Sequence, residues 1–203
     1  MKSPNSPTGS VGRPRAFDTD AALEKAMCVF WRQGYEGTSL SDLTEAMGIN
    51  RPSLYAAFGN KEELFRKVLE RYGKGPANYA QEALGQASAR QVIEHLWRGA
   101  AANAADPLYP RGCLAVQSAL CCGEEGQGAS DVARAMRMGA QDSLVERFKR
   151  AQREGDLPLS VQPEDLARYV ATFLNGMSVQ ASNGATREEL LRAVEIALRA
   201  LPV

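Results

Sequence analysis

Apolar residues recur at helical spacing along most of this chain. Beyond residue 76 the periodic segments lie around 77–86, 89–105, 113–122, 130–154, 164–182 and 187–200, and Gly, Pro or polar clusters separate them. No segment shows the strict alternation of apolar and polar residues that is typical of a half-buried strand. The pattern therefore predicts an all-α fold.

The N-terminal part predicts two longer helices. The first begins after Asp18, which can cap it, and continues to Gly34. The second begins after Asn60 and runs to residues 73–76, where Gly and Pro stop or kink a helix. The apolar stripes are Leu23, Ala26, Met27, Phe30 and Trp31 in the first helix, and Leu64, Phe65, Val68, Leu69 and Tyr72 in the second.

Residues 38–60 predict two short helices joined by a tight turn. Ser39 can cap the first helix, Gly48 suits the left-handed position that ends it, and Asn50 can cap the second. Such a pair is a helix-turn-helix. An ordinary helical hairpin in an all-α core would show a similar pattern, so the spacing alone leaves both interpretations open.

The second short helix has two different faces. Leu54 and Phe58 point to one side, and Pro52, Ser53 and Ala56 point to the other. Small side chains let a helix approach the floor of a major groove, whereas a merely solvated face usually carries Lys and Glu. Lys61 follows at the start of the next helix, where a phosphate oxygen would be favoured.

The run from Phe17 to Phe65 resembles the N-terminal domain of the TetR family of bacterial transcription regulators. The resemblance rests on Gly34-Tyr35, Gly37-Thr38, the turn with Leu43, Met47, Gly48 and Ile49, and then Leu54-Tyr55, Phe58 and Lys61-Glu62-Glu63-Leu64. It covers about a quarter of the chain. It implies a three-helix helix-turn-helix DNA-binding domain at residues 17–61, followed by a larger helical domain at 62–203 for effector binding and dimerisation.

The resemblance also implies the DNA contacts. Groove positions are Arg51, Pro52, Ser53 and Ala56; phosphate contacts are Thr38, Tyr55 and Lys61; and Arg13 and Arg15 form a basic arm in the disordered segment 1–16. A solubilising tail is the other interpretation of that segment. Pro52 and the pair Ala56-Ala57 depart from common family versions and offer few groups that hydrogen-bond to bases. Specificity is therefore expected from Arg51, methyl contacts and DNA shape.

Charge and composition narrow the picture. The 24 basic and 24 acidic residues cancel, while residues 1–17 carry only Lys2, Arg13 and Arg15, so this segment is +3 and the remainder is −3. We expect a cytoplasmic protein, because no run of about 18 apolar residues and no signal-peptide core is present. Cys28, Cys113, Cys121 and Cys122 have no CxxC spacing, which argues against a disulfide framework and a zinc site. No metal, cofactor or membrane partner is expected.

Two strong apolar helices close the chain. They could simply complete the core of the monomer. In TetR-like proteins the last two long helices pair with their symmetry mates, so the resemblance implies a four-helix homodimer interface. The side chains predicted to form it are Leu166, Tyr169, Val170, Phe173, Met177, Leu190, Val194 and Leu198.

The middle of the chain is where the resemblance implies a ligand pocket. The candidate lining residues are His95, Trp97, Tyr109, Cys113 and Gln117, together with Met136 and Met138. Aromatic and Met side chains at this spacing are also ordinary core residues. Cys113 stands at a predicted helix start near Arg111, and both features stabilise a thiolate that reacts with electrophiles. Its Gly-Cys-Leu context resembles a subgroup of TetR regulators that includes electrophile-responsive repressors, although a packing role is the alternative.

These observations together predict a DNA-binding regulator. The expected protein is a homodimeric repressor that a small-molecule effector, including an electrophile, releases from a pseudo-palindromic operator. An architectural DNA binder without a sensor is the alternative, and the long body past residue 61 argues against it. No HExxH, GxSxG, P-loop or GxGxxG motif is present, so an enzyme is not expected.

Overall fold

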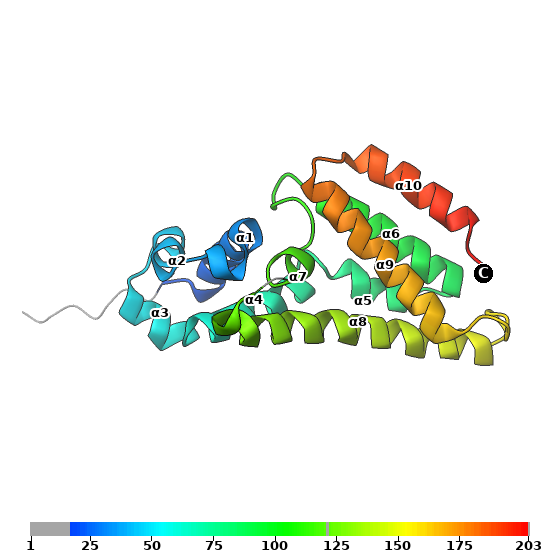
Figure 1. Ribbon diagram of the computed structural model, residues 1–203, viewed down its shortest axis with the longest axis horizontal. Helices are drawn as coiled ribbons and strands as arrows, with labels where there is room; N and C mark the ends of the chain where they lie inside the picture. Colours follow the sequence, from blue (N-terminus) through cyan, green and yellow to red (C-terminus); the bar gives the residue numbers. More distant parts are fainter. Residues whose placement is uncertain (1–16, 121, 203) are drawn as a thin grey trace, which may run out of the picture.

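The computed structural model describes residues 17–120 and 122–202, and every regular element in these ranges is helical (Figure 1). The elements are α1 (Thr19–Gly37), α2 (Leu40–Met47), α3 (Arg51–Phe58), α4 (Lys61–Lys74), α5 (Tyr79–Leu84), α6 (Ala89–Ala104), α7 (Leu114–Gln117), the 3-10 turn η1 (Glu124–Gly126), α8 (Gln127–Arg153), α9 (Pro163–Ser182) and α10 (Arg187–Arg199). The all-α prediction is confirmed. Over these residues, none of the helices has the length and apolar character needed to cross a membrane. Arg13 and Arg15, predicted to form a basic arm, lie outside the described residues.

Helix ends in the N-terminal part form where the sequence places capping residues. Asp18 Oδ1 accepts from the amides of residues 20 and 21, and Ser39 and Asn60 each form a reciprocal capping box with the acidic residue three positions on. Gly48 adopts the left-handed conformation, with φ 71°, at the end of α2. Local chemistry therefore fixes the bounds of α2, α3 and α4 before any tertiary contact is considered.

Helices α1–α4 pack around one apolar core, which we call the head core. Phe30, Leu43, Leu54 and Phe65 are fully buried in it. The same core continues into α7 and the start of α8, where Ala129 and Ala133 are buried against it. The predicted domain boundary after residue 61 thus falls at the first residue of α4, and the buried face of α4 belongs to the head.

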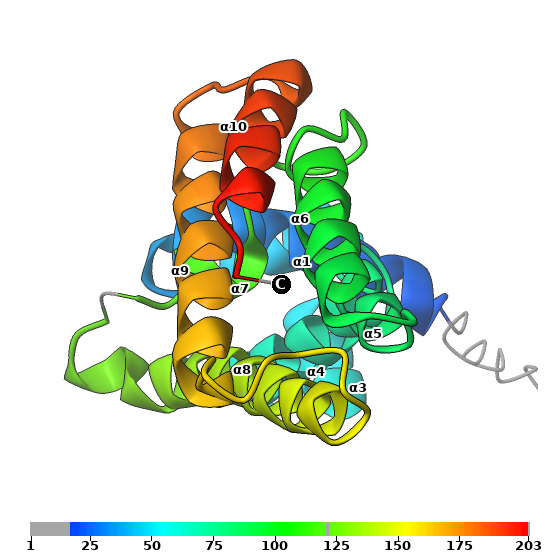
Figure 2. The same ribbon diagram turned by 90° about the vertical axis from the view of Figure 1, so that its right-hand side faces the viewer.

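Helices α5, α6, α8, α9 and α10 enclose a second core, which we call the body core. Trp97, Phe148 and Val170 are fully buried there. Figure 2 shows α6, α9 and α10 side by side at the end of the body. Figure 1 shows α8 running beneath both parts, with its first turns at the head and its last turns at the body. Helix α8 therefore contributes side chains to both the head core and the body core.

The structure corrects the predicted dimer stripe. Six of its eight members are 4% exposed or less, because their side chains point toward α6 and α8 inside the body core: Leu166, Val170, Met177, Leu190, Val194 and Leu198. Tyr169 is 43% exposed and Phe173 is half-buried. The apolar side chains that α9 and α10 turn outward also include Val179 and Ile196, which the sequence analysis did not single out.

Candidate nucleic-acid interface and ligand cavity

Helix α3 presents a small, open face at the end of the head. Its N-terminus is capped by Asn50, whose Oδ1 accepts from the amide of Ser53 at 2.9 Å. Leu54 and Phe58 fix its inner face in the head core. Arg51, Pro52, Tyr55 and Ala56 are exposed on the outside and Ser53 is half-buried. These are five of the residues predicted to meet DNA, and the structure brings them together on one helix.

The side chain of Arg51 is already held in place. Its Nη2 donates to Ser41 Oγ on α2 at 3.0 Å. Both residues are exposed, so the guanidinium keeps further donors free to face a ligand outside the head. Sequence reasoning missed Ser41, and the only available signal was its place on the outer side of the first short helix.

Thr38 does not lie where a phosphate contact requires. Its side chain is 1% exposed, and Oγ1 donates to the carbonyl of Gly34 at 2.6 Å. The hydroxyl thus completes the end of α1 inside the head. The predicted phosphate role of Thr38 is corrected to a structural one.

Lys61 stands at the first residue of α4, with its ammonium 4.3 Å from the centroid of the Tyr35 ring. This is a cation–π contact, and the ring itself is fixed edge-on against Phe65. Burial lowers the pKa of Lys61, and the carboxylates of Glu36 and Asp42 act in the opposite direction. The helix N-terminus and the half-buried ammonium together make a ready anion site.

An apolar cavity of about 300 Å³ lies between head and body. Residues from α4, α5, α6, α7, α8 and α9 line it, among them Tyr72, Tyr79, Cys113, Met136 and Met138. Its walls are mostly carbon, and a few polar groups point into it. That combination is typical of a small-molecule site. Of the predicted ligand residues, Cys113 and the two methionines line this cavity.

Cys113 has two polar neighbours inside this cavity. The hydroxyl of Tyr72 donates to Cys113 Sγ at 3.2 Å. Arg137 from α8 donates to the carbonyl of Ala115, and it lines the cavity together with Cys113. The predicted cation, Arg111, instead points to the carbonyl of Ala185 at 3.5 Å. Burial is also the main cause that raises the pKa values of Tyr72 and Tyr79, so both phenols stay protonated donors.

The other predicted ligand residues lie elsewhere. His95 lies 3.6 Å from Glu82 beside a separate surface hollow, and Trp97 is a core residue whose Nε1 donates to the carbonyl of Val170. Gln117 donates to Ser182 Oγ at the end of α9. These three predictions are corrected, because helical periodicity does not distinguish an inward side chain in a core from one in a cavity.

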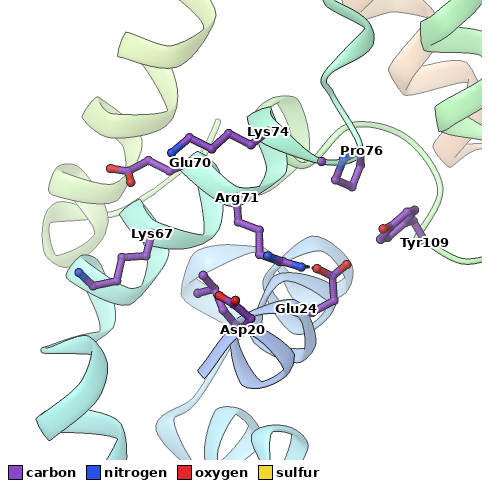
Figure 3. A pocket seen from close by; sticks show the side chains of 10 residues that line it. Asp20, Glu24, Lys67, Glu70, Arg71, Lys74, Pro76 and Tyr109 are labelled. Carbon is purple, nitrogen blue, oxygen red and sulfur yellow. Dashed lines mark hydrogen bonds and ion pairs between the residues drawn. The ribbon is translucent and has the colours of Figure 1, made fainter. Parts of the chain in front are cut away.

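Tyr109 lies at the edge of a charged cleft of about 440 Å³ on the surface (Figure 3). Its ring stacks on Trp31 at 5.7 Å between centroids. Across the cleft, Glu24 on α1 and Arg71 on α4 form an ion pair, which Figure 3 shows as a dashed line. Paired surface charges of this kind are solvated and weakly stabilising. Tyr109 does not line the apolar cavity, and its ligand role stays a prediction.

The comparisons with known proteins agree with this geometry. Residues 22–68 match the family model described as bacterial regulatory proteins, tetR family. The chain is 36% identical to the HTH-type transcriptional repressor ComR of Escherichia coli, over 95% of this chain and 93% of that protein. It is 30% identical to the uncharacterized HTH-type transcriptional regulator YezE of Bacillus subtilis, over 94% and 100% of the two chains.

A solved structure is similar over nearly the whole length. It is a cysteine mutant of the TetR family transcriptional regulator CifR complexed with 26-bp double-strand operator DNA, and it has a TM-score of 0.89 and 47% identity over 94% of this chain and 100% of that chain. The matched segment 22–68 holds α2 and α3, the two helices that the sequence analysis assigned to a helix-turn-helix. This chain therefore belongs to the TetR family of bacterial regulatory proteins and is a DNA-binding transcription regulator rather than an enzyme.

Proposed function

We propose that the protein is a homodimeric repressor that leaves its operator when a small electrophile adds to Cys113. The observation that carries the proposal is the position of this cysteine. It lies in the wall of the apolar cavity, at the start of a helix that is packed between head and body, with the Tyr72 hydroxyl 3.2 Å from its sulfur. The relative ComR is named a transcriptional repressor, which supports repression here.

On the DNA side, α3 would enter the major groove with Arg51 foremost. The bare surface of Pro52 and Ala56 permits close approach, and Lys61 at the start of α4 meets the backbone. A homodimer would place two such helices about 34–36 Å apart on a pseudo-palindrome. Occupation of the operator would then block transcription. The similar regulator CifR has been solved in complex with double-strand operator DNA.

On the ligand side, the cavity volume sets the size of the effector. About 300 Å³ is at the lower end of the range for small-molecule pockets, roughly 300–1,000 Å³. The ligand is therefore small and mainly apolar. Two polar groups of the wall, Tyr72 and Arg137, cluster with the cysteine, and the lining also holds polar residues such as Gln141 and Asn175.

That clustering suits addition to an electron-poor carbon, such as the β-carbon of an unsaturated carbonyl compound. The Cys113 sulfur supplies an electron pair to form a C–S bond, the π pair of the alkene moves toward the carbonyl oxygen, and the thiol proton ends on the α-carbon. The Tyr72 hydroxyl and the Arg137 guanidinium would stabilise the negative oxygen that develops. The reaction is an addition, so it needs no oxidant.

The test is operator binding before and after thiol addition. An operator is first selected from random duplexes, and its affinity for the protein is measured by fluorescence anisotropy at fixed salt. N-ethylmaleimide, an unsaturated carbonyl probe, is then added to protein in which Cys28, Cys121 and Cys122 are replaced by Ser, and intact-mass spectrometry counts the adducts. We expect one adduct per chain and a loss of specific affinity of 10-fold or more, because typical coupling free energies correspond to about 5–150-fold.

The matched control is the Cys113→Ser protein treated in the same way. It should keep its affinity for the operator. Equal release of the control would show that the reagent acts elsewhere, and full retention of DNA by the singly labelled protein would refute the sensor role. Equal, salt-dependent binding to all duplexes would instead favour an architectural DNA binder.

A further inference from the structure

Helix α7 touches both the cavity and the head. Its cap, Cys113, and its residues Ala115 and Val116 line the cavity, while Leu114 is fully buried in the head core. The helix is only four residues long, Leu114–Gln117, although the sequence predicts a longer one at 113–122. Because it is so short, a displacement at its first residue moves its last residue as well.

The end of α7 is held by a bond to α1. Ser118 is 3% exposed, and its carbonyl accepts the amide hydrogen of Tyr35 at 2.7 Å. These two residues are far apart in sequence. Among the described residues, this is the only backbone–backbone hydrogen bond that joins α1 to the α7 segment.

A break in α1 makes this bond possible. Gly34 has φ 72° and ψ 173°, a conformation outside the helical region and with a positive φ that glycine adopts most readily. The break turns the Tyr35 amide away from the helix axis and toward Ser118. Nearby, Glu36 Oε1 accepts from the amide of Gly123, so a second hydrogen bond holds the same short segment to the chain after α7.

The other side of Tyr35 holds Lys61. The Tyr35 ring is 8% exposed, stacks at 6.0 Å on Phe30, and carries the Lys61 ammonium 4.3 Å above its centre. Lys61 is the cation at the start of α4 that would meet a DNA phosphate. Cys113, α7, Ser118, Tyr35 and Lys61 thus form one continuous chain of contacts from the cavity to the DNA-facing surface.

We infer that Tyr35 is a positioning residue through which α7 controls Lys61, and that ligand in the cavity weakens DNA binding by breaking the bond between Ser118 and Tyr35. This inference rests on the proposed function and adds its route. An adduct on Cys113 displaces α7, the Ser118 carbonyl leaves the Tyr35 amide, and the ring no longer holds the Lys61 ammonium at the phosphate. Helix α7 then has two arrangements, one with and one without the hydrogen bond between Ser118 and Tyr35. DNA favours the first arrangement and the ligand favours the second.

The direct test removes the Tyr35 amide as a hydrogen-bond donor; the ester also makes the Gly34 carbonyl, which accepts from Thr38 Oγ1, a weaker acceptor. Incorporation of the α-hydroxy analogue of tyrosine at this position replaces the N–H by an ester oxygen and leaves every side chain unchanged. We expect the unlabelled ester protein to bind the selected operator about 10-fold more weakly than wild type. Labelling of Cys113 should lower the operator affinity of the ester protein by less than a further 2-fold. The control is an ester at Arg187, whose amide lies in the first turn of α10 and has no intrahelical acceptor.

A second pair of variants tests the ring. Tyr35→Leu removes the aromatic surface under Lys61, and Tyr35→Phe keeps it. The Leu protein should lose operator affinity about 3- to 10-fold and show a shallower salt dependence, whereas the Phe protein should resemble wild type. Circular dichroism melting establishes that both are folded before DNA is added.

The outcomes separate the route from the sensor. Suppose that the unlabelled Tyr35 ester protein binds the operator as tightly as wild type, and that labelling of Cys113 weakens operator binding by the same factor in both proteins. The contact route through Tyr35 would then be wrong, while Cys113 would still be the sensor. If labelled wild type keeps DNA, the sensor role of Cys113 is wrong. The unlabelled ester protein still decides the route in that case, because normal operator affinity of this protein overturns it.

Discussion

Arg51 begins the recognition helix and is the longest polar side chain on its outer face. Its guanidinium is held by Ser41 at 3.0 Å, while its neighbours Pro52 and Ala56 offer no side-chain donor. Arg51→Ala should therefore weaken operator binding by about 1–3 kcal/mol and relax base preference at one position of each half-site. Anisotropy titrations against operators with single base-pair changes measure both effects. Ser41→Ala is the control that loosens Arg51 without removing it, and full sequence preference in the Arg51→Ala protein would contradict the assignment.

Lys61 should behave differently, because a phosphate contact carries no base information. Lys61→Gln is expected to weaken binding to all sequences about equally. The slope of log affinity against log salt should become shallower by about 1 for each subunit. Titrations at several salt concentrations give this slope. Lys74→Gln, at the other end of α4, should leave it unchanged, and a loss confined to the cognate operator would show that Lys61 reads bases.

At single positions the sequence predicts which residues cap a helix better than it predicts where a given side chain points. It identified the capping residues and the exposed set on α3, because these depend on neighbours within four residues. It placed Thr38 on DNA, although this hydroxyl turns inward to Gly34, and it assigned Arg111 to Cys113, although Arg137 from α8 takes that place. The two errors differ in cause. Arg137 comes from another helix, which no spacing around Cys113 encodes, whereas the partner of Thr38 is only four residues away and the pattern did not show that this hydroxyl turns back to α1.

The start of α4 is the element on which Lys61 depends. Asn60 Oδ1 accepts from the amide of Glu63 at 2.9 Å, and Glu63 Oε2 accepts from the amide of Asn60 at 2.8 Å. Asn60→Ala removes one half of this capping box and should lower the free energy of unfolding by about 1 kcal/mol. Urea denaturation followed by circular dichroism gives the difference. Asn60→Ser can still cap and should keep most of the stability, so equal losses in the two proteins would argue against a capping effect.

The apolar pattern predicts that a helix forms more reliably than it predicts where the helix ends or which element covers its apolar face. Helices α6, α8, α9 and α10 occur within a few residues of their predicted ranges, because their stripes are long and their ends carry caps or Gly and Pro. Helix α7 is shorter than predicted: it ends at Gln117, and the carbonyl of the next residue, Ser118, accepts from the amide of Tyr35. On α9 the stripe of Leu166 and Val170 proved to be core, since periodicity shows that a face is apolar but not whether the same chain covers it.

At the scale of the whole molecule, the long helix α8 spans both cores and the short helix α7 packs beside it. Helix α8 contributes Ala133 to the head core and Phe148 to the body core, so both parts share a single strut. Residues of both α7 and α8 line the cavity, and α7 is the shortest α-helix in the described part of the chain. By the route proposed above, a ligand in the cavity would act on the head without unfolding either core, since packed cores change between discrete packings rather than deforming continuously.

A dimer is required for the two recognition helices to act together, and α9 and α10 carry the surface that suits it. Tyr169, Val179 and Ile196 are 43%, 48% and 70% exposed, and Gly176 on the same side of α9 leaves room for a helix to approach. Val179→Glu combined with Ile196→Glu would bury two carboxylates in a homodimer interface, which costs far more than the interface gains at those positions. We expect this protein to sediment as a single chain of 22.0 kDa, whereas wild type sediments at twice that mass.

Loss of the dimer should also lower the affinity for the specific operator by at least 100-fold. The second head then binds as a separate molecule, so the gain in affinity from linking two binding sites, about 10²–10⁴-fold, disappears. Analytical ultracentrifugation and operator anisotropy on the same sample test both statements. Leu159→Glu is the matched control: Leu159 is 81% exposed and lies in the connection between α8 and α9, away from the outward face of α10. If the control dissociates and the double variant stays dimeric, the subunits meet through another surface, and the spacing of the two α3 helices must be set by that surface instead.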